Sequence, residues 1–182
     1  MTQSEFENEL FDGFTHSNNI KVRLDFLNVL TYLNLYIEDP IDFLFNNLYL
    51  SPANTDKDKS EFFKYVKKKM DNDLTETLID KLFNIFTDKI CIDQKNCQVL
   101  PYQAFESYLK VFLENNQKKN LLKYNKLDRD NIFDITSYCS SPENLEGFDT
   151  LWRIIFESFS NEIMNKGIEI LHDLYTVSII NR

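Results

Sequence analysis

The pattern of apolar positions predicts a long helix near the start of the chain. Between Ser17 and Asp39 the spacing of three or four residues lays one apolar stripe along a helix. Proline disfavours helix in the residue before it, so this helix should end at Asp39, which can then cap a new helix starting at Pro40. The stripe consists of Ile20, Leu24, Leu27, Leu30, Leu33 and Ile37.

Three more segments repeat the amphipathic pattern. Asp58–Met70 places Phe62, Phe63, Val66 and Met70 opposite lysines, and Thr75–Ile90 has a wider apolar face that two neighbours could cover. Pro101 can open a further helix that continues through Leu113. The intervening stretches 51–58, 91–100 and 115–131 show no clear period, and we expect loops there.

The C-terminal part predicts two paired helices. Ser141 and Pro142 form a helix-start signal, and Ser160 can cap the second helix after a short connection, which makes the two helices antiparallel. Gly167 lies within the second stripe and would let the partner backbone, or Trp152, approach closely. The first stripe is Phe148, Leu151, Trp152, Ile155 and Phe159; the second is Ile163, Gly167, Ile170, Leu171 and Leu174.

Helical hairpins without strands predict an all-α fold. The chain has 182 residues with only 3 glycines and 4 prolines, which favours helices joined by polar loops. We expect residues 1–182 to form a single helical-repeat segment, with antiparallel hairpins stacked as an armadillo- or HEAT-like right-handed superhelix. The hairpins carry this interpretation, because the sequence has no strict repeat.

The net charge and the cysteines indicate which partners and which cellular compartment to expect. The net charge of -9 repels nucleic-acid phosphates and anionic lipid heads, so neither partner is expected. No apolar run approaches the roughly 20 residues of a membrane span, and the acidic N-terminus does not resemble a secretory signal. The 3 cysteines follow no disulfide spacing. We therefore expect reduced thiols and a cytoplasmic protein, with the nucleus as an alternative.

The same cysteines are poor candidates for catalysis. A thiol enzyme needs a histidine base beside the nucleophile and donors for an oxyanion. His16 precedes a predicted helix and His172 lies beside Asp173 near the end of the last stripe, so neither is predicted to join Cys91, Cys97 or Cys139 in a dyad. The sequence predicts no catalytic residue.

Metal and cofactor sites are not expected either. Cys91 and Cys97 enclose five residues, a wider spacing than zinc-binding pairs use, and no second pair follows. The acidic run around Asp128 lacks the central glycine and terminal glutamate of a calcium loop, so helix capping explains it better. Its members are Asp128, Asp130, Asn131 and Asp134. The glycines stand too far apart to form a phosphate-binding loop.

Two surface interpretations stay open. The lysines of KYVKKKM, Lys64, Lys67 and Lys68, could contact an acidic partner, but their spacing opposite Phe62 and Val66 is typical of a solvated helix face. Trp152 could anchor a partner protein, although its place in an apolar stripe favours the core.

The C-terminal residues carry a family resemblance. NLEGFDTLWRIIFESFSNEIMNKGIEILHDLYT is similar to the helical region that precedes the ubiquitin-like domain in the fat facets-type ubiquitin-specific proteases, the FAF-X group. EFFKYVKKKM, PYQAFESYLKVFLENN and IKVRLDFLNVL resemble earlier helices of that region, so the similarity extends from about His16 to Thr176. Its most specific blocks are Leu151–Arg153 and Leu174–Thr176, and VSIINR departs from the family.

The resemblance implies a non-catalytic, armadillo- or HEAT-like scaffold segment of a large cysteine-type deubiquitinase. Neither the cysteine box nor the histidine box of that family occurs here, so no catalytic residue carries over. Expected partners are ubiquitinated substrates, adaptors or the parent's own catalytic domain. The alternative is a free-standing helical-repeat adaptor that binds a partner helix or peptide and is unrelated to ubiquitin.

Overall fold

The computed structural model describes residues 5, 9, 12–13, 17, 22, 25, 40–50, 55–72, 74–125 and 134–180. The predicted helix between Ser17 and Asp39 and the site of His16 therefore lie outside, or almost entirely outside, the described residues. The described part is mostly helical, which confirms the all-α prediction at this level. The chain divides into two compact units, Met1–Val66 and Lys67–Arg182.

The first unit is held by stacked aromatic rings. Helix α3 (Pro40–Leu44) begins at the predicted proline and continues as a π-helical turn, η1 (Phe45–Leu50). The rings of Phe45 and Tyr49 stack at 5.2 Å, and those of Phe62 and Phe63 meet edge to face at 5.1 Å. Phe45, Phe62 and Phe63 are fully buried, so this aromatic cluster lies in the apolar core of the described part of the unit.

Helix α4 (Asp56–Asn72) starts earlier than its apolar pattern predicts. Thr55 and Asp58 form a capping box, in which the Asp58 carboxylate accepts hydrogen bonds from the Thr55 amide and hydroxyl at 2.8 Å. The predicted loop 51–58 is therefore wrong for its last three residues, because this box starts a helix within a polar stretch. The unit boundary falls inside α4, after Val66.

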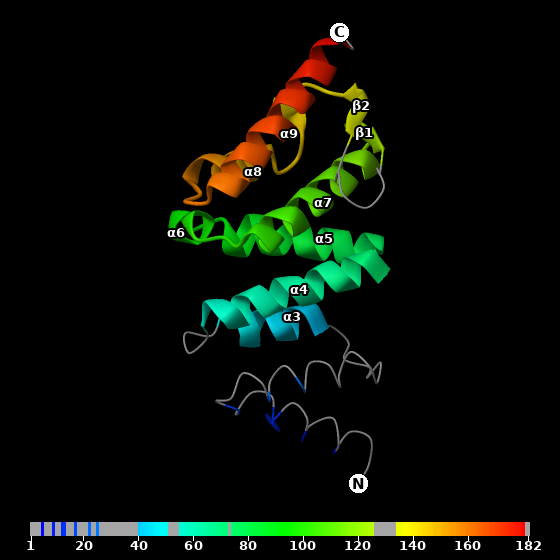
Figure 1. Cartoon of the computed structure of the whole chain (residues 1–182). Helices are drawn as coiled ribbons and strands as arrows, with labels where there is room; N and C mark the ends of the chain where they lie inside the picture. Colours follow the sequence, from blue (N-terminus) through cyan, green and yellow to red (C-terminus); the bar gives the residue numbers. More distant parts are fainter. Residues whose placement is uncertain are drawn as a thin grey trace. The chain divides into compact units, whose positions relative to one another are not determined.

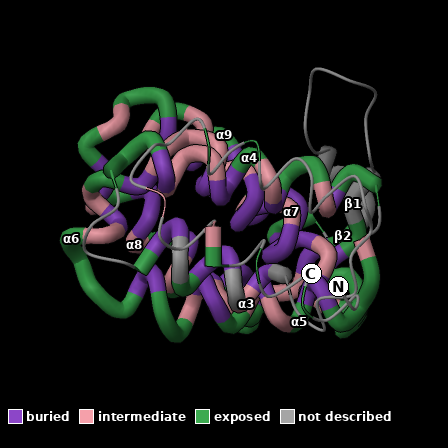
Figure 2. The backbone as a smooth tube through the Cα atoms, turned by 90° about the horizontal axis from the view of Figure 1, so that it is seen from below, coloured by how far each residue is buried: buried purple, intermediate pink, exposed green. Residues whose placement is uncertain are grey.

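The second unit is built around helix α7 (Tyr102–Lys118). Helix α5 (Glu76–Asn84) is capped by Thr75 and passes into a π-helical segment, η2 (Ile85–Ile90). A short helix, α6 (Gln94–Gln98), interrupts the predicted loop 91–100. Figure 1 shows α5 and α7 packed together, and Figure 2 shows buried stretches in α7.

The end of α7 corrects the predicted loop 115–131. Helix α7 continues through Lys118, and strands β1 (Leu122–Asn125) and β2 (Asp134–Cys139) form an antiparallel hairpin in which Leu122 pairs with Cys139. Strand β2 packs on α9 and β1 on α7. The prediction of a strand-free chain is therefore wrong locally. The acidic candidates Asp128, Asp130 and Asn131 lie outside the described residues, and Asp134 begins β2.

The C-terminal part forms the predicted helical hairpin, but its first helix begins at Phe148 and not at the predicted start, Ser141–Pro142. A 3-10 turn, η3 (Pro142–Asn144), follows Ser141, and helices α8 (Phe148–Glu157) and α9 (Asn161–Ile180) then pack against each other (Figure 1). The amide of Ile163 donates to the Ser160 hydroxyl at 3.4 Å, so Ser160 caps α9 as expected.

Candidate protein-binding face

The start of α8 is fixed by a glycine that no other residue could replace without strain. Gly147 has a φ of 78°, and an added Cβ would lie 2.7 Å from the Tyr108 hydroxyl and 2.8 Å from the Phe83 ring. The Tyr108 hydroxyl donates to the Gly147 carbonyl at 2.6 Å, and the Leu151 amide donates to the same oxygen at 2.9 Å. The core of the unit thus sets the position of α8.

The inner face of α8 packs tightly on α9 at Gly167. A Cβ on Gly167 would lie 2.2 Å from Cγ1 of Ile155, far closer than atoms tolerate. Gly167 is therefore the close-approach position that the sequence predicts, but Ile155 rather than Trp152 fills the space. Leu151, Ile154 and Ile155 are fully buried. These three residues form the packed side of α8.

The outer face of α8 is also apolar. Trp152 and Phe156 lie one turn apart with ring centroids 4.4 Å from each other, and they are 45% and 51% exposed. Phe148 contacts Trp152 at 6.2 Å and Tyr175 of α9 edge to face at the same distance. We call Phe148, Trp152, Phe156 and Tyr175 the aromatic row. The prediction of a core Trp152 is wrong, because α8 buries the side that carries Ile154 instead.

More exposed apolar side chains lie on the same hairpin. Phe159 is 74% exposed in the turn between α8 and α9, so its predicted place in the buried stripe is also wrong. Ile168, Ile179 and Ile180 are exposed on α9. Single exposed apolar residues are ordinary, but a gathering of large ones on one hairpin is typical of a contact surface.

The hairpin surface is acidic. Its basic residues are both ion-paired, Arg153 with Glu157 at 3.5 Å and Lys166 with Glu169 at 2.9 Å. Carboxylates outnumber these cations in segment 141–180: Glu143, Glu146, Asp149, Glu157, Glu162, Glu169 and Asp173. A surface of this kind attracts apolar partner segments that carry lysine or arginine.

The residues considered for catalysis lie in different environments. His172 is exposed on α9, where its ring lies 3.4 Å from the Asp173 carboxylate. Cys91, Cys97 and Cys139 are buried. Burial raises the pKa of Cys139 to about 11, which keeps this thiol protonated at neutral pH. Within the described ranges, no group of three His, Cys, Asp or Glu residues is arranged to hold a metal ion.

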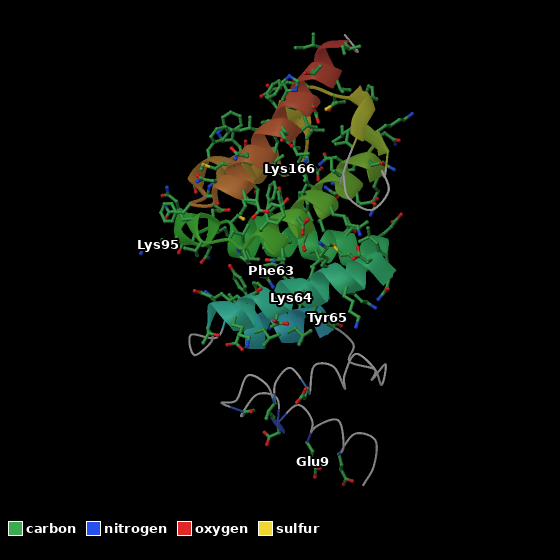
Figure 3. The ribbon with its side chains drawn as sticks, in the orientation of Figure 1. Glu9, Phe63, Lys64, Tyr65, Lys95 and Lys166 are labelled. Atoms are coloured by element: carbon green, nitrogen blue, oxygen red, sulfur yellow. The ribbon has the colours of Figure 1, made fainter. Side chains whose placement is uncertain are left out.

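The lysines of α4 behave as a solvated face. Lys64 is exposed and pairs with Glu61 of the same helix at 2.7 Å (Figure 3). Lys67 is exposed and pairs with Glu106 at 2.9 Å. Exposed pairs of this kind contribute little to stability and serve mainly to keep the helix surface polar.

Comparisons with known proteins found no match. No protein-family model, curated protein or solved structure matches the chain. None of the described helices is both long enough and apolar enough to cross a membrane. The aromatic row on the α8–α9 hairpin is therefore the feature on which a functional proposal can be built.

Proposed function

We propose that the chain is a non-catalytic helical scaffold whose α8–α9 hairpin binds a protein partner through the aromatic row. The observation that carries this proposal is the exposure of Trp152 and Phe156 on a helix whose opposite side is already fully packed. The fold does not need these two rings for its core, and leaving them in water is unfavourable.

The chemistry of the row indicates the kind of partner. Tryptophan and tyrosine are the side chains most often found at the energetic centres of protein interfaces. The surrounding carboxylates, such as Asp149 and Glu162, favour a partner segment with apolar residues flanked by lysine or arginine. The partner we infer is therefore a basic, amphipathic protein segment.

The resemblance to fat facets-type ubiquitin-specific proteases supplies the context of the proposal. Its most specific blocks, Leu151–Arg153 and Leu174–Thr176, lie on α8 and α9 and contain Trp152 and Tyr175 of the aromatic row. We propose that the hairpins belong to an armadillo- or HEAT-like stack that positions a catalytic domain or its substrates. Cytoplasmic or nuclear placement belongs to the same proposal.

Photo-crosslinking tests the partner face. A photoreactive residue at Phe159 would capture neighbours in cells, and each captured protein would be purified and titrated while the fluorescence of Trp152, the only tryptophan, is followed. We expect a blue shift, a contact segment rich in lysine or arginine, and at least a tenfold weaker affinity for Phe156→Ala. Ile92→Ala, on an exposed residue outside the hairpin, is the matched control.

Two outcomes would contradict the proposal. If Phe156→Ala binds every captured protein as tightly as the unmodified chain, the aromatic row is not the contact face. If the chain alone cleaves a ubiquitin–fluorophore conjugate, and replacing one cysteine abolishes this cleavage, the chain is an enzyme and the scaffold proposal fails. The full open reading frame decides the context, because a deubiquitinase parent must continue into cysteine and histidine boxes.

A further inference from the structure

Two buried cysteines meet at the junction of η2 and α6. Cys91 follows the π-helical segment as its C-cap, and its amide donates to the Phe86 carbonyl at 2.9 Å. Cys97 lies in α6, with its thiol 4.0 Å from the Cys91 carbonyl oxygen. Both side chains are almost completely buried. Wide π-type turns are frequent at functional positions, and here one delivers the first thiol to the second.

The two thiols also interact directly. A hydrogen bond between them raises the pKa of Cys91, to which burial adds, and the same bond lowers the pKa of Cys97. In this arrangement the Cys91 thiol donates and the Cys97 sulfur accepts. Cys97 is therefore the more readily ionised thiol and the better nucleophile of the pair.

Helix α8 provides charges next to the pair. Arg153 lies close enough to lower the pKa of both thiols, while Glu157 acts in the opposite direction. The Glu157 Oε2 atom is the one buried side-chain oxygen or nitrogen in the described residues that lacks a hydrogen-bond partner. The thiols thus lie in a polar corner of an otherwise apolar interior.

Only one turn separates the pair from solvent. Residues 92–95 are exposed, with Ile92 67% exposed, and Lys95 projects from the outer end of α6 (Figure 3). Hydrogen bonds from the Lys95 amide to Asp93 and from the Asn96 side chain to the Ile90 carbonyl hold this turn. The turn also packs on α8, so a small molecule reaches the sulfurs only when this segment opens by local unfolding.

We propose that Cys91 and Cys97 form a redox modification site that a peroxide-class oxidant converts into an intramolecular disulfide. The Cys97 thiolate attacks one peroxide oxygen, which gives a sulfenic acid and releases hydroxide. The Cys91 sulfur then attacks the sulfenic sulfur, the S–S bond forms, and water leaves. Overall, two thiols and one hydrogen peroxide give one disulfide and two water molecules.

The site does not depend on the proposed partner binding. It uses the inner side of the α6 turn, whereas Trp152 and Phe156 of the aromatic row are exposed on α8. Its chemistry requires only that the two sulfurs approach bonding distance within one turn, and the Cys97 thiol already lies against the Cys91 carbonyl.

The test is hydrogen peroxide treatment of the full chain under native conditions, followed by alkylation, intact-mass measurement and peptide mapping. We expect a monomer that has lost two hydrogens and two alkylation sites, with Cys91 linked to Cys97 and the link reversed by dithiothreitol. Cys139→Ser, on the other buried cysteine, should behave identically. Cys97→Ser should lose the product.

Oxidation in urea is the second arm of the test. The unfolded chain should give mixed pairings that include Cys139, because nothing then positions Cys91 beside Cys97. The proposal is overturned if the native chain yields no intramolecular disulfide, links Cys139, or pairs its cysteines as randomly as in urea. Mapping of the unmodified chain decides the matter even where a serine variant does not fold.

Discussion

Helices α7 and α8 differ in which side chains they bury. Helix α7 buries the polar residues Ser107, Asn115 and Asn116, whereas α8 leaves the large apolar side chains of Trp152 and Phe156 half exposed. The buried amides of α7 are satisfied by hydrogen bonds, so they contribute to the fold. The exposed rings of α8 have no such role within the described residues, and the proposed partner face rests on this contrast.

Asn116 is a buried polar residue of α7 whose side chain makes several hydrogen bonds. Its side-chain oxygen accepts from the Glu146 amide at 2.8 Å, and its side-chain nitrogen donates to the Glu146 and Phe112 carbonyls at 2.9 and 2.8 Å. Asn116→Ala should lower the free energy of unfolding by about 3 kcal/mol, because backbone groups of the turn before α8 lose their partners. Urea unfolding would measure this loss.

The control for this change is Asn165→Ala, on an exposed asparagine of α9, which should alter stability by less than about 0.5 kcal/mol. A similarly small loss for Asn116→Ala would break the comparison, since the buried amide would then be structurally idle.

The inner face of α8 allows the next test. Gly167→Ala should destabilise the fold by about 2 kcal/mol through the clash with Ile155, even though alanine favours helix. Adding Ile155→Ala removes the clashing atoms, so the double variant should lose less stability than the two single changes predict together. Additive losses in a double-mutant cycle would show that the two residues do not share this space.

Tyr108 provides a smaller effect that depends on pH. Tyr108→Phe removes the hydrogen bond to Gly147 and should cost about 1 kcal/mol at neutral pH, because the carbonyl retains the Leu151 amide. Burial raises the pKa of Tyr108 above its usual value near 10. Above that pH the unfolded chain loses this proton while the folded chain keeps it, so stability falls with rising pH.

The Tyr108→Phe variant has no phenol proton at this position, so its stability does not fall with pH for this reason. The stability difference between the two chains should therefore shrink by about 1.4 kcal/mol per pH unit above pH 10 and then change sign. Unfolding at pH 7, 9 and 10.5 would measure it, and the other tyrosines cancel because both chains carry them. A difference that stays constant up to pH 10.5 would mean that Tyr108 is not buried in the fold.

The smallest effect on stability is expected on the exposed side. The double change Trp152→Ala and Phe156→Ala should cost at most about 1 kcal/mol, since both rings keep much of their surface in water. Leu151→Ala, on the buried side of the same helix, should cost about 2–5 kcal/mol. Equal losses for the two changes would show that the aromatic row belongs to the core.

Local signals in the sequence predict the helices well. Pro40, Thr75 and Ser160 lie at or next to helix starts, where proline and hydroxyl side chains favour initiation, and Gly167 lies at the predicted close contact. These features depend on neighbouring residues, so periodicity and capping reveal them. The stacking of the hairpins as a superhelix stays a prediction.

The exposed face could not be predicted in the same way. Helix α8 is apolar on two sides, one with Leu151 and Ile154 and the other with Trp152 and Phe156, so periodicity alone cannot say which side is packed. Asn116 misled the interpretation of segment 115–131 because its hydrogen bonds come from Glu146, far along the chain. The strand signal of Ile135, Thr136 and Tyr138 was available but short.

The turn between α8 and α9 combines a fixed backbone with a free side chain. The Phe159 amide donates to the Gln98 carbonyl at 3.0 Å, while its ring stays in water. The backbone under this ring is already held by its hydrogen bond to α6. A partner that binds the ring would therefore not have to order the loop, which lowers the entropic cost of association. The same tether means that a change in the α6 segment would be felt directly beneath Phe159.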